Sequence, residues 1–175
     1  ASGDAAAFPV LVLLHQNPSS SVEYDALLRE MARDRRVIAF DTPGNGMSDP
    51  PPGPQSIALY VGAFSDALDA MGLGLDRKVD LFGYHTGALH CPELAIQRPD
   101  RVGRLAISGI PYRSEAERAQ RLDEIRATAP PTEDGAAILA RLKSLWAFTV
   151  TERDPRVPIE RAAQIFAEKA KPLHR

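Results

Sequence analysis

The sequence predicts an α/β protein, with a mostly parallel β-sheet flanked by helices. Four short segments are mainly apolar on both faces, a pattern typical of strands that helices cover on both sides of a sheet. They alternate with stretches whose apolar residues recur at helical spacing. Two glycines also bracket the point where one predicted strand passes into a predicted helix. The length of 175 residues, with 44% hydrophobic and 25% charged residues, is ordinary for a globular protein with a sizeable core.

The predicted strands comprise residues 9–14, 36–40, 78–82 and 102–108. A first helix is predicted after Ser20 and Glu23, which have the spacing of a capping box. Its apolar stripe consists of Tyr24, Leu27, Leu28 and Met31. A second helix is predicted to begin after Ser56, its N-cap, and to end at Gly72. Its stripe consists of Ile57, Val61, Phe64, Leu68 and Met71.

After residue 108 the strand pattern ends, and three helical segments follow at about 114–127, 132–148 and 158–170. Their starts are a capping box at Ser114 and Glu117, an N-cap at Thr132 and a first-turn proline at Pro158. We therefore expect two domains. Residues 1–111 form an α/β core, and residues 112–175 form a helical cap over the strand ends.

The turn Gly83-Tyr84-His85-Thr86-Gly87 has the frame of a nucleophile elbow. Glycines on both sides allow the central residue to adopt a strained backbone and to point into a pocket. Here that residue is His85, between the strand over 78–82 and a helix over 87–98. Pro92 interrupts this helix, so we expect a kink or a later helix start.

These motifs together resemble the α/β-hydrolase family from about residue 9 to residue 111. Residues 13–18 (LLHQNP) are similar to the family's H-G-x-P strand end, and residues 41–48 (DTPGNGMS) to its D-x-x-G-x-G-x-S loop. His85 falls at the position of the nucleophile, and residues 98–102 match the usual passage from helix to strand. The Asn-Pro form of the first motif is closest to haloalkane dehalogenases and epoxide hydrolases.

The resemblance implies a site between core and cap. Thr86 contributes its backbone amide to an oxyanion hole, and the loop around Gln16 and Asn17 supplies the second donor. Tyr84 and Trp146 line the substrate pocket. In this family the catalytic acid and a catalytic histidine usually follow the cap. We therefore expect the chain to be truncated at its C-terminus, and the family's first strands to be missing before residue 9.

The chemistry of His85 is open to several interpretations. An imidazole titrates near neutral pH, so His85 can act as a general base, as a nucleophile through a neutral ring nitrogen, or as a charged anchor for an anion. The positive end of the following helix favours the neutral ring. A nucleophilic His85 gives an acyl-imidazole that water hydrolyses. The alternative is a pocket residue in a protein that has lost catalysis.

Other polar residues near these motifs are assigned structural roles. The hydroxyl of Thr86 is one residue away from the tip and is not expected to be the nucleophile. His15 ends a strand and is expected to hold the neighbouring loop by hydrogen bonds. Asp41 is expected to fix its own loop through bonds to backbone amides.

Composition excludes several classes of partner. A net charge of −2 gives no reason to expect nucleic acid or an anionic membrane. The single Cys91 excludes an intrachain disulfide, and the adjacent His90 points about 100° away on a helix. His174 follows no predicted strand and has no carboxylate placed to orient it, so we expect no metal site. We also expect no cofactor. We expect a cytoplasmic protein that acts on a small molecule, and the oligomeric state stays open.

The function that these features favour is hydrolysis of a small organic substrate of ester, epoxide or halide type. His85 lies at the reaction centre of this hypothesis. The alternative is a catalytically inactive relative that binds a ligand in the same pocket. A structural interaction module has no positive support in the sequence.

Overall fold

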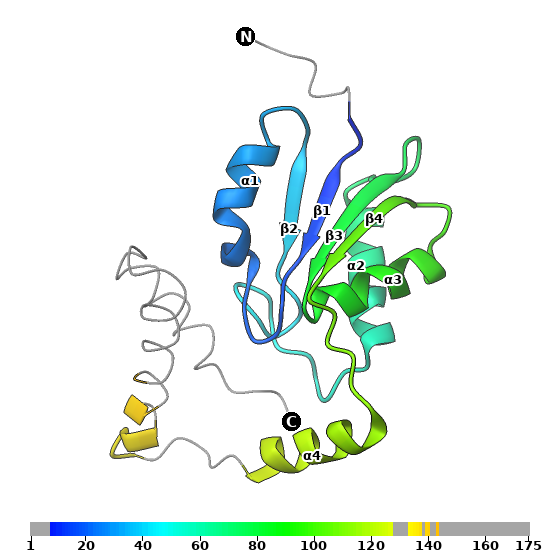
Figure 1. The fold of residues 1–175 in the computed structure, drawn as a ribbon. Coiled ribbons are helices and arrows are strands. Elements are labelled where there is room, and N and C mark those ends of the chain that lie inside the picture. The colour runs from blue at the N-terminus through cyan, green and yellow to red at the C-terminus, as the bar shows by residue number, and fades with distance from the viewer. Residues whose placement is uncertain (1–7, 128–132, 138, 141–142, 144–175) are drawn as a thin grey trace. The chain divides into compact units, whose positions relative to one another are not determined.

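The computed structural model describes residues 8–127, 133–137, 139–140 and 143. The chain divides between Pro111 and Tyr112 into two compact units. The first unit has three layers, with a central sheet between helices, as the sequence predicts (Figure 1). Within the described residues, no helix is both long and apolar enough to cross a membrane.

The sheet consists of β1 (Leu11–Leu14), β2 (Val37–Phe40), β3 (Val79–Tyr84) and β4 (Val102–Ser108). All neighbours are parallel, in the order β2-β1-β3-β4. In this register Leu14 lies beside Phe40 and Gly83, and Tyr84 lies beside Ser108. The carboxyl ends of the strands therefore meet at one edge, where parallel sheets usually bind ligands.

One face of the sheet is covered by α2 (Ile57–Ala70) and α3 (Gly87–Gln97). The buried residues of this layer are Val12, Leu14, Val61, Phe64, Leu68, Leu73, Val79, Leu81, Cys91, Leu94 and Val102. The predicted N-cap of α2 is confirmed, because the N–H of Leu59 donates to the Ser56 hydroxyl at 3.3 Å. The outer members of the predicted stripe, Ile57 and Met71, remain exposed.

The opposite face is covered by the short 3-10 helix η1 (Ser21–Tyr24) and by α1 (Asp25–Met31). Tyr24 packs edge-on against Phe82 at 5.9 Å between ring centroids. Its hydroxyl also donates to the Leu14 carbonyl at 2.8 Å. The prediction of a capping box at Ser20 and Glu23 is wrong, since the buried Ser20 side chain makes no capping bond. The Glu23 carboxylate instead accepts two hydrogen bonds from Gln16.

The helix α3 begins directly at Gly87 and continues through Pro92, so a later start is ruled out. Its first turn forms because the carbonyl of Thr86 accepts hydrogen bonds from the N–H groups of Leu89 and His90, at 2.9 Å and 3.2 Å. Proline removes one N–H from the interior of the helix, and it leaves these first bonds intact.

The strand β4 differs from the prediction of burial on both faces. Only Val102 is buried, and residues 103–108 are exposed, including Leu105 and Ile107. β4 lies at the end of the strand order, so within the described residues one of its edges has no neighbouring strand. An apolar run alone does not determine how much of a strand its neighbours cover.

The described part of the second unit contains α4 (Glu115–Ala127). Its predicted capping box is confirmed, because the Ser114 N–H donates to the Glu117 carboxylate at 2.7 Å and the Glu117 N–H donates to the Ser114 hydroxyl at 3.3 Å. No residue of α4 is buried. The helix predicted over 158–170 lies outside the described residues, and so do Thr132 and Trp146.

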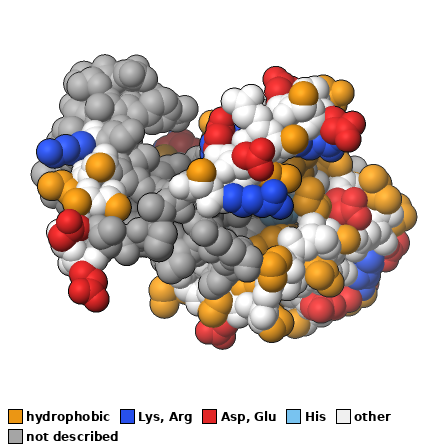
Figure 2. Space-filling view, turned by 90° about the horizontal axis from the view of Figure 1, so that it is seen from below, with side chains coloured by type: hydrophobic (Ala, Val, Ile, Leu, Met, Phe, Trp, Pro, Cys, Tyr) orange, Lys and Arg blue, Asp and Glu red, His pale blue; other side chains and the backbone are white. Residues whose placement is uncertain are grey.

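Charged side chains of both signs are interspersed with hydrophobic ones on the described part of the face in Figure 2. This mixture agrees with a formal net charge of −2 for 21 basic and 23 acidic residues. The described part of this face therefore carries charges of both signs.

Candidate active site

His85 occupies the turn between β3 and α3, as the sequence predicts. Its φ is 52°, a left-handed conformation that is uncommon outside glycine. The predicted backbone strain at the tip is therefore confirmed. Strain of this kind costs on the order of 1–3 kcal/mol and persists where the surrounding structure imposes it.

The two glycines of the elbow are required by close approach of the backbone. A Cβ atom at Gly83 would collide with the carbonyl group of Gly87. A Cβ atom at Gly87 would collide with the carbonyl group of Leu14, at the end of β1. The start of α3 therefore packs directly on β1 and β3, and this packing holds the turn at the carboxyl edge of the sheet.

The loop after β1 meets the elbow across 69 positions of sequence. The backbone N–H of Asn17 donates to the Thr86 hydroxyl at 3.1 Å. The same hydroxyl oxygen lies 3.4 Å from Nδ1 of His85. The Thr86 N–H has no hydrogen-bond acceptor among the residues that the structure describes. Of the residues predicted for the site, His85, Thr86 and Asn17 are thus brought together.

Gln16 points its donors toward η1. Its backbone N–H donates to the Glu23 carboxylate at 3.2 Å, and its side-chain amide donates to the same carboxylate at 3.0 Å. These two bonds tie the loop to the helical layer on one side of the sheet. Gln16 therefore supports the loop next to Asn17.

His15 is fully buried and holds the loop after β1 by hydrogen bonds, which confirms the predicted structural role. Its Nε2 accepts a hydrogen bond from the N–H of Thr42 at 3.0 Å, so this nitrogen is unprotonated. The proton of the neutral ring is then on Nδ1, which donates to the Gln16 carbonyl at 2.6 Å. His15 thereby joins the loop after β1 to the loop after β2.

Asp41 fixes the loop after β2, as predicted. Its carboxylate accepts hydrogen bonds from the backbone N–H groups of Ser21 at 2.6 Å and Met47 at 2.9 Å. Burial alone would raise the pKa of Asp41, but these hydrogen bonds outweigh it and hold the pKa below its usual value. The carboxylate is therefore a structural acceptor.

His90 and Cys91 belong to the core beneath the elbow. His90 lies between the rings of Tyr60 and Phe64, with each ring centroid 5.6 Å away, and burial lowers its pKa to about 4. Burial raises the pKa of the Cys91 thiol to about 12. No group of residues that suits a metal ion occurs in the described part of the chain. His174 lies outside it.

Tyr84 is the described member of the predicted substrate pocket. Its ring centroid lies 6.4 Å from that of His85. It is partly buried against the cluster of Leu11, Leu13 and Tyr24. Tyr84 is therefore next to the tip of the elbow, and Trp146 is the member outside the described residues.

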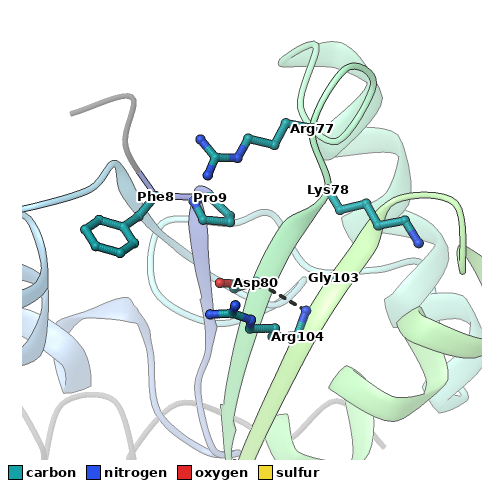
Figure 3. Close-up of a pocket in the computed structure, with 7 residues that line it drawn as sticks. All are labelled: Phe8, Pro9, Arg77, Lys78, Asp80, Gly103 and Arg104. Carbon is teal, nitrogen blue, oxygen red and sulfur yellow. Dashed lines mark hydrogen bonds between the residues drawn. The ribbon is translucent and has the colours of Figure 1, made fainter. Parts of the chain in front are cut away.

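A surface pocket lies at the opposite end of the strands (Figure 3). Its lining residues are Phe8, Pro9, Arg77, Lys78, Asp80, Gly103 and Arg104. Asp80 accepts a hydrogen bond from the Arg104 N–H at 3.0 Å and pairs with Arg35 at 3.6 Å. Because these residues precede or begin the strands, this pocket is separate from the elbow.

Sequence reasoning missed three residues that support the site. Thr42 binds His15, Glu23 binds Gln16, and the Ser108 carbonyl accepts the N–H of His85 at 2.9 Å. Thr42 lies within the 41–48 motif and Glu23 within the expected capping box, but their hydrogen-bond partners lie in other segments. Ser108 had no signal beyond its place at the end of a predicted strand.

A family model described as the alpha/beta hydrolase fold matches residues 9–162. The chain therefore belongs to the α/β-hydrolase fold family. A hydrolase from Pseudomonas aeruginosa has a similar structure, with a TM-score of 0.69 and 22% identity over 93% of this chain and 63% of that one. The enol-lactonase from Burkholderia xenovorans LB400 has a TM-score of 0.62 and 20% identity over 93% of this chain and 64% of that one. These likenesses show the shared fold.

Two curated relatives match part of the chain. Epoxide hydrolase 4 of Mus musculus is 30% identical over 108 residues, which are 61% of this chain and 29% of that protein. The 2-hydroxymuconate semialdehyde hydrolase of Pseudomonas sp. strain CF600 is 32% identical over 107 residues, which are 59% of this chain and 37% of that protein. The chain thus spans about a third of the length of these relatives.

Proposed function

We propose that the protein is a hydrolase for a small organic substrate of ester, epoxide or halide type, with His85 at the reaction centre. The observation that carries this proposal is the position of His85. It has a strained backbone, lies at the start of α3 and is next to an amide, that of Thr86, without a described acceptor. In an elbow, this is the arrangement of a nucleophile beside an oxyanion donor.

For an ester, His85 attacks the carbonyl carbon through an unprotonated ring nitrogen. The positive end of α3 disfavours a second positive charge and so keeps the imidazole neutral. The bond to the alkoxide then breaks, and the alkoxide takes the proton from the other ring nitrogen. Water hydrolyses the resulting acyl-imidazole to the carboxylic acid and regenerates His85.

The developing negative charge is stabilised by backbone donors in this proposal. The N–H of Thr86 is the first donor, and the N–H of Asn17 is the second. Gln16 supports the second donor through its bonds to Glu23. Tyr84 and Trp146 line the pocket, and residues 112–175 form the cap that covers it.

A second candidate is ligand binding without catalysis. The observation that favours it is the identity of the tip residue, since His85 stands where hydrolases with this elbow carry serine, cysteine or aspartate. The same pocket would then bind a small organic ligand, and His85 would act as a polar contact.

The two candidates differ in turnover. The test uses the full-length protein and a panel of short-chain esters, epoxides and haloalkanes. The enzyme proposal predicts turnover of at least one class, and it predicts that His85→Ser retains or raises ester turnover if the remaining catalytic partners are present. Binding of a non-hydrolysable substrate analogue without turnover of any class would support the binding candidate and refute the enzyme.

A further inference from the structure

We propose that the Thr86 hydroxyl keeps the oxyanion hole closed in the resting protein by holding the amide of Asn17. This inference rests on the proposed function, because it concerns the second donor of that site. An oxyanion hole on an elbow requires two N–H groups, one from the residue after the tip and one from the loop that follows a neighbouring strand. Here these groups belong to Thr86 and Asn17.

The second donor is already engaged in the structure. The N–H of Asn17 donates to Oγ1 of Thr86 at 3.1 Å, within the normal range for such a bond. A single N–H makes one good hydrogen bond at a time, so an oxyanion must compete with the hydroxyl for it. In this state the hole offers the Thr86 N–H alone.

Thr86 is at the N-cap position of α3, where a threonine hydroxyl usually accepts a hydrogen bond from the first turn of its own helix. It makes no such bond here. The first turn is instead bonded through backbone carbonyls, from Ala88 to His85 at 3.0 Å and from Leu89 to Thr86 at 2.9 Å. The Thr86 hydroxyl therefore does not cap α3, and it accepts a hydrogen bond from the loop after β1 instead.

The part of the loop that joins Asn17 to β1 is held firmly by hydrogen bonds. Gln16 is bound twice to Glu23, and the buried His15 is bound to Thr42. Loop movement would break these bonds, whereas rotation of the Thr86 side chain would break its bond to Asn17 and its 3.4 Å contact with Nδ1 of His85. We therefore expect the hole to open by rotation of Thr86 about χ1, which has staggered alternatives.

The test compares Thr86→Val, which keeps the shape and removes the hydroxyl, with Thr86→Ser, which keeps the hydroxyl. The first measurement is solvent exchange of the Asn17 amide by NMR. A hydrogen bond of ordinary net strength predicts exchange about fivefold faster in Thr86→Val than in the wild type, and nearly unchanged exchange in Thr86→Ser. Equal exchange rates in all three proteins would overturn the proposal.

The second measurement is binding of phenylphosphonate, a tetrahedral anion that resembles the intermediate of ester hydrolysis and requires no turnover. We expect Thr86→Val to bind it about fivefold more tightly, with a shift of the Asn17 amide resonance on binding. Weaker binding in Thr86→Val would show that the hydroxyl assists anion binding. It would overturn the proposal that the hydroxyl keeps the oxyanion hole closed. If the wild type turns over no substrate, the proposed enzyme fails, and the exchange and binding measurements still decide the role of Thr86.

Discussion

The backbone N–H of His85 donates a 2.9 Å hydrogen bond to the carbonyl of Ser108, the last residue of β4. Tyr84, which precedes His85, is the partner of Ser108 in the sheet register. The hydrogen bonding of the sheet thus extends to the tip of the elbow, although the φ of His85 is 52°. The strained residue is supported by the sheet as well as by its two glycines, which is what a fixed reaction centre requires.

The first prediction concerns the close packing of α3 on β1. We expect Gly87→Ala to lower the free energy of unfolding by more than about 3 kcal/mol, because the added methyl collides with the Leu14 carbonyl and backbone must move. Urea denaturation of the purified chain measures the change.

Gly62→Ala is the matched control for this prediction. Gly62 lies inside α2, and nothing lies within 4 Å of an added Cβ. Alanine should therefore stabilise the protein by about 0.5–1 kcal/mol through helix propensity. Gly87→Ala with the stability of the wild type would contradict the close packing of the elbow.

The second prediction concerns the pH dependence of stability. Burial lowers the pKa of His90 to about 4 in the folded state, against an ordinary value near 6.5. As the pH falls below about 6.5 the unfolded state binds the proton first, so folding stability decreases down to about pH 4. We expect the loss to be about 2–3 kcal/mol, measured by urea denaturation between pH 7 and pH 4.

His90→Gln removes this titration and should flatten the stability curve over the same pH window. Asp41 affects only the acid end of this window, because the pKa of its carboxyl is lowered in the folded state and its contribution declines only as the pH approaches the ordinary pKa of aspartate. This decline is the same in the wild type and in His90→Gln. If His90→Gln shows the same slope as the wild type between pH 6.5 and pH 4, His90 is not the group responsible.

The third prediction concerns the single cysteine. Cys91 is fully buried, and burial raises its pKa to about 12, so almost no thiolate is present at pH 8. We expect no reaction of the folded protein with a disulfide reagent such as Ellman's reagent within minutes, and one thiol per chain after addition of urea. Rapid labelling of the native protein would contradict the described core.

The sequence predicted the elements of the fold well where local chemistry decides. The strands follow from apolar runs, and the turn at His85 follows from the glycine frame, because a backbone collision at Gly83 or Gly87 leaves no choice of residue. The exposure of residues 103–108 was not predictable from their apolar pattern, since it depends on which neighbours cover β4.

The candidate site was predictable in part. The turn and its loop carry recognisable motifs, but the bond between Asn17 and Thr86 joins segments 69 positions apart and depends on one side-chain rotamer. Glu23 was misread as a capping residue for a similar reason. Its spacing from Ser20 suits a capping box. Only the fold brings Gln16 close enough to donate hydrogen bonds to the Glu23 carboxylate instead.

The most direct test of the proposed enzyme is the kcat/KM of His85→Ala in the full-length protein, on whichever substrate class the wild type turns over. If His85 carries the reaction, its removal should lower kcat/KM by at least about a thousandfold. Binding of phenylphosphonate should change little, because the backbone donors remain. A kcat/KM equal to that of the wild type would contradict the account and would place the chemistry elsewhere in the protein.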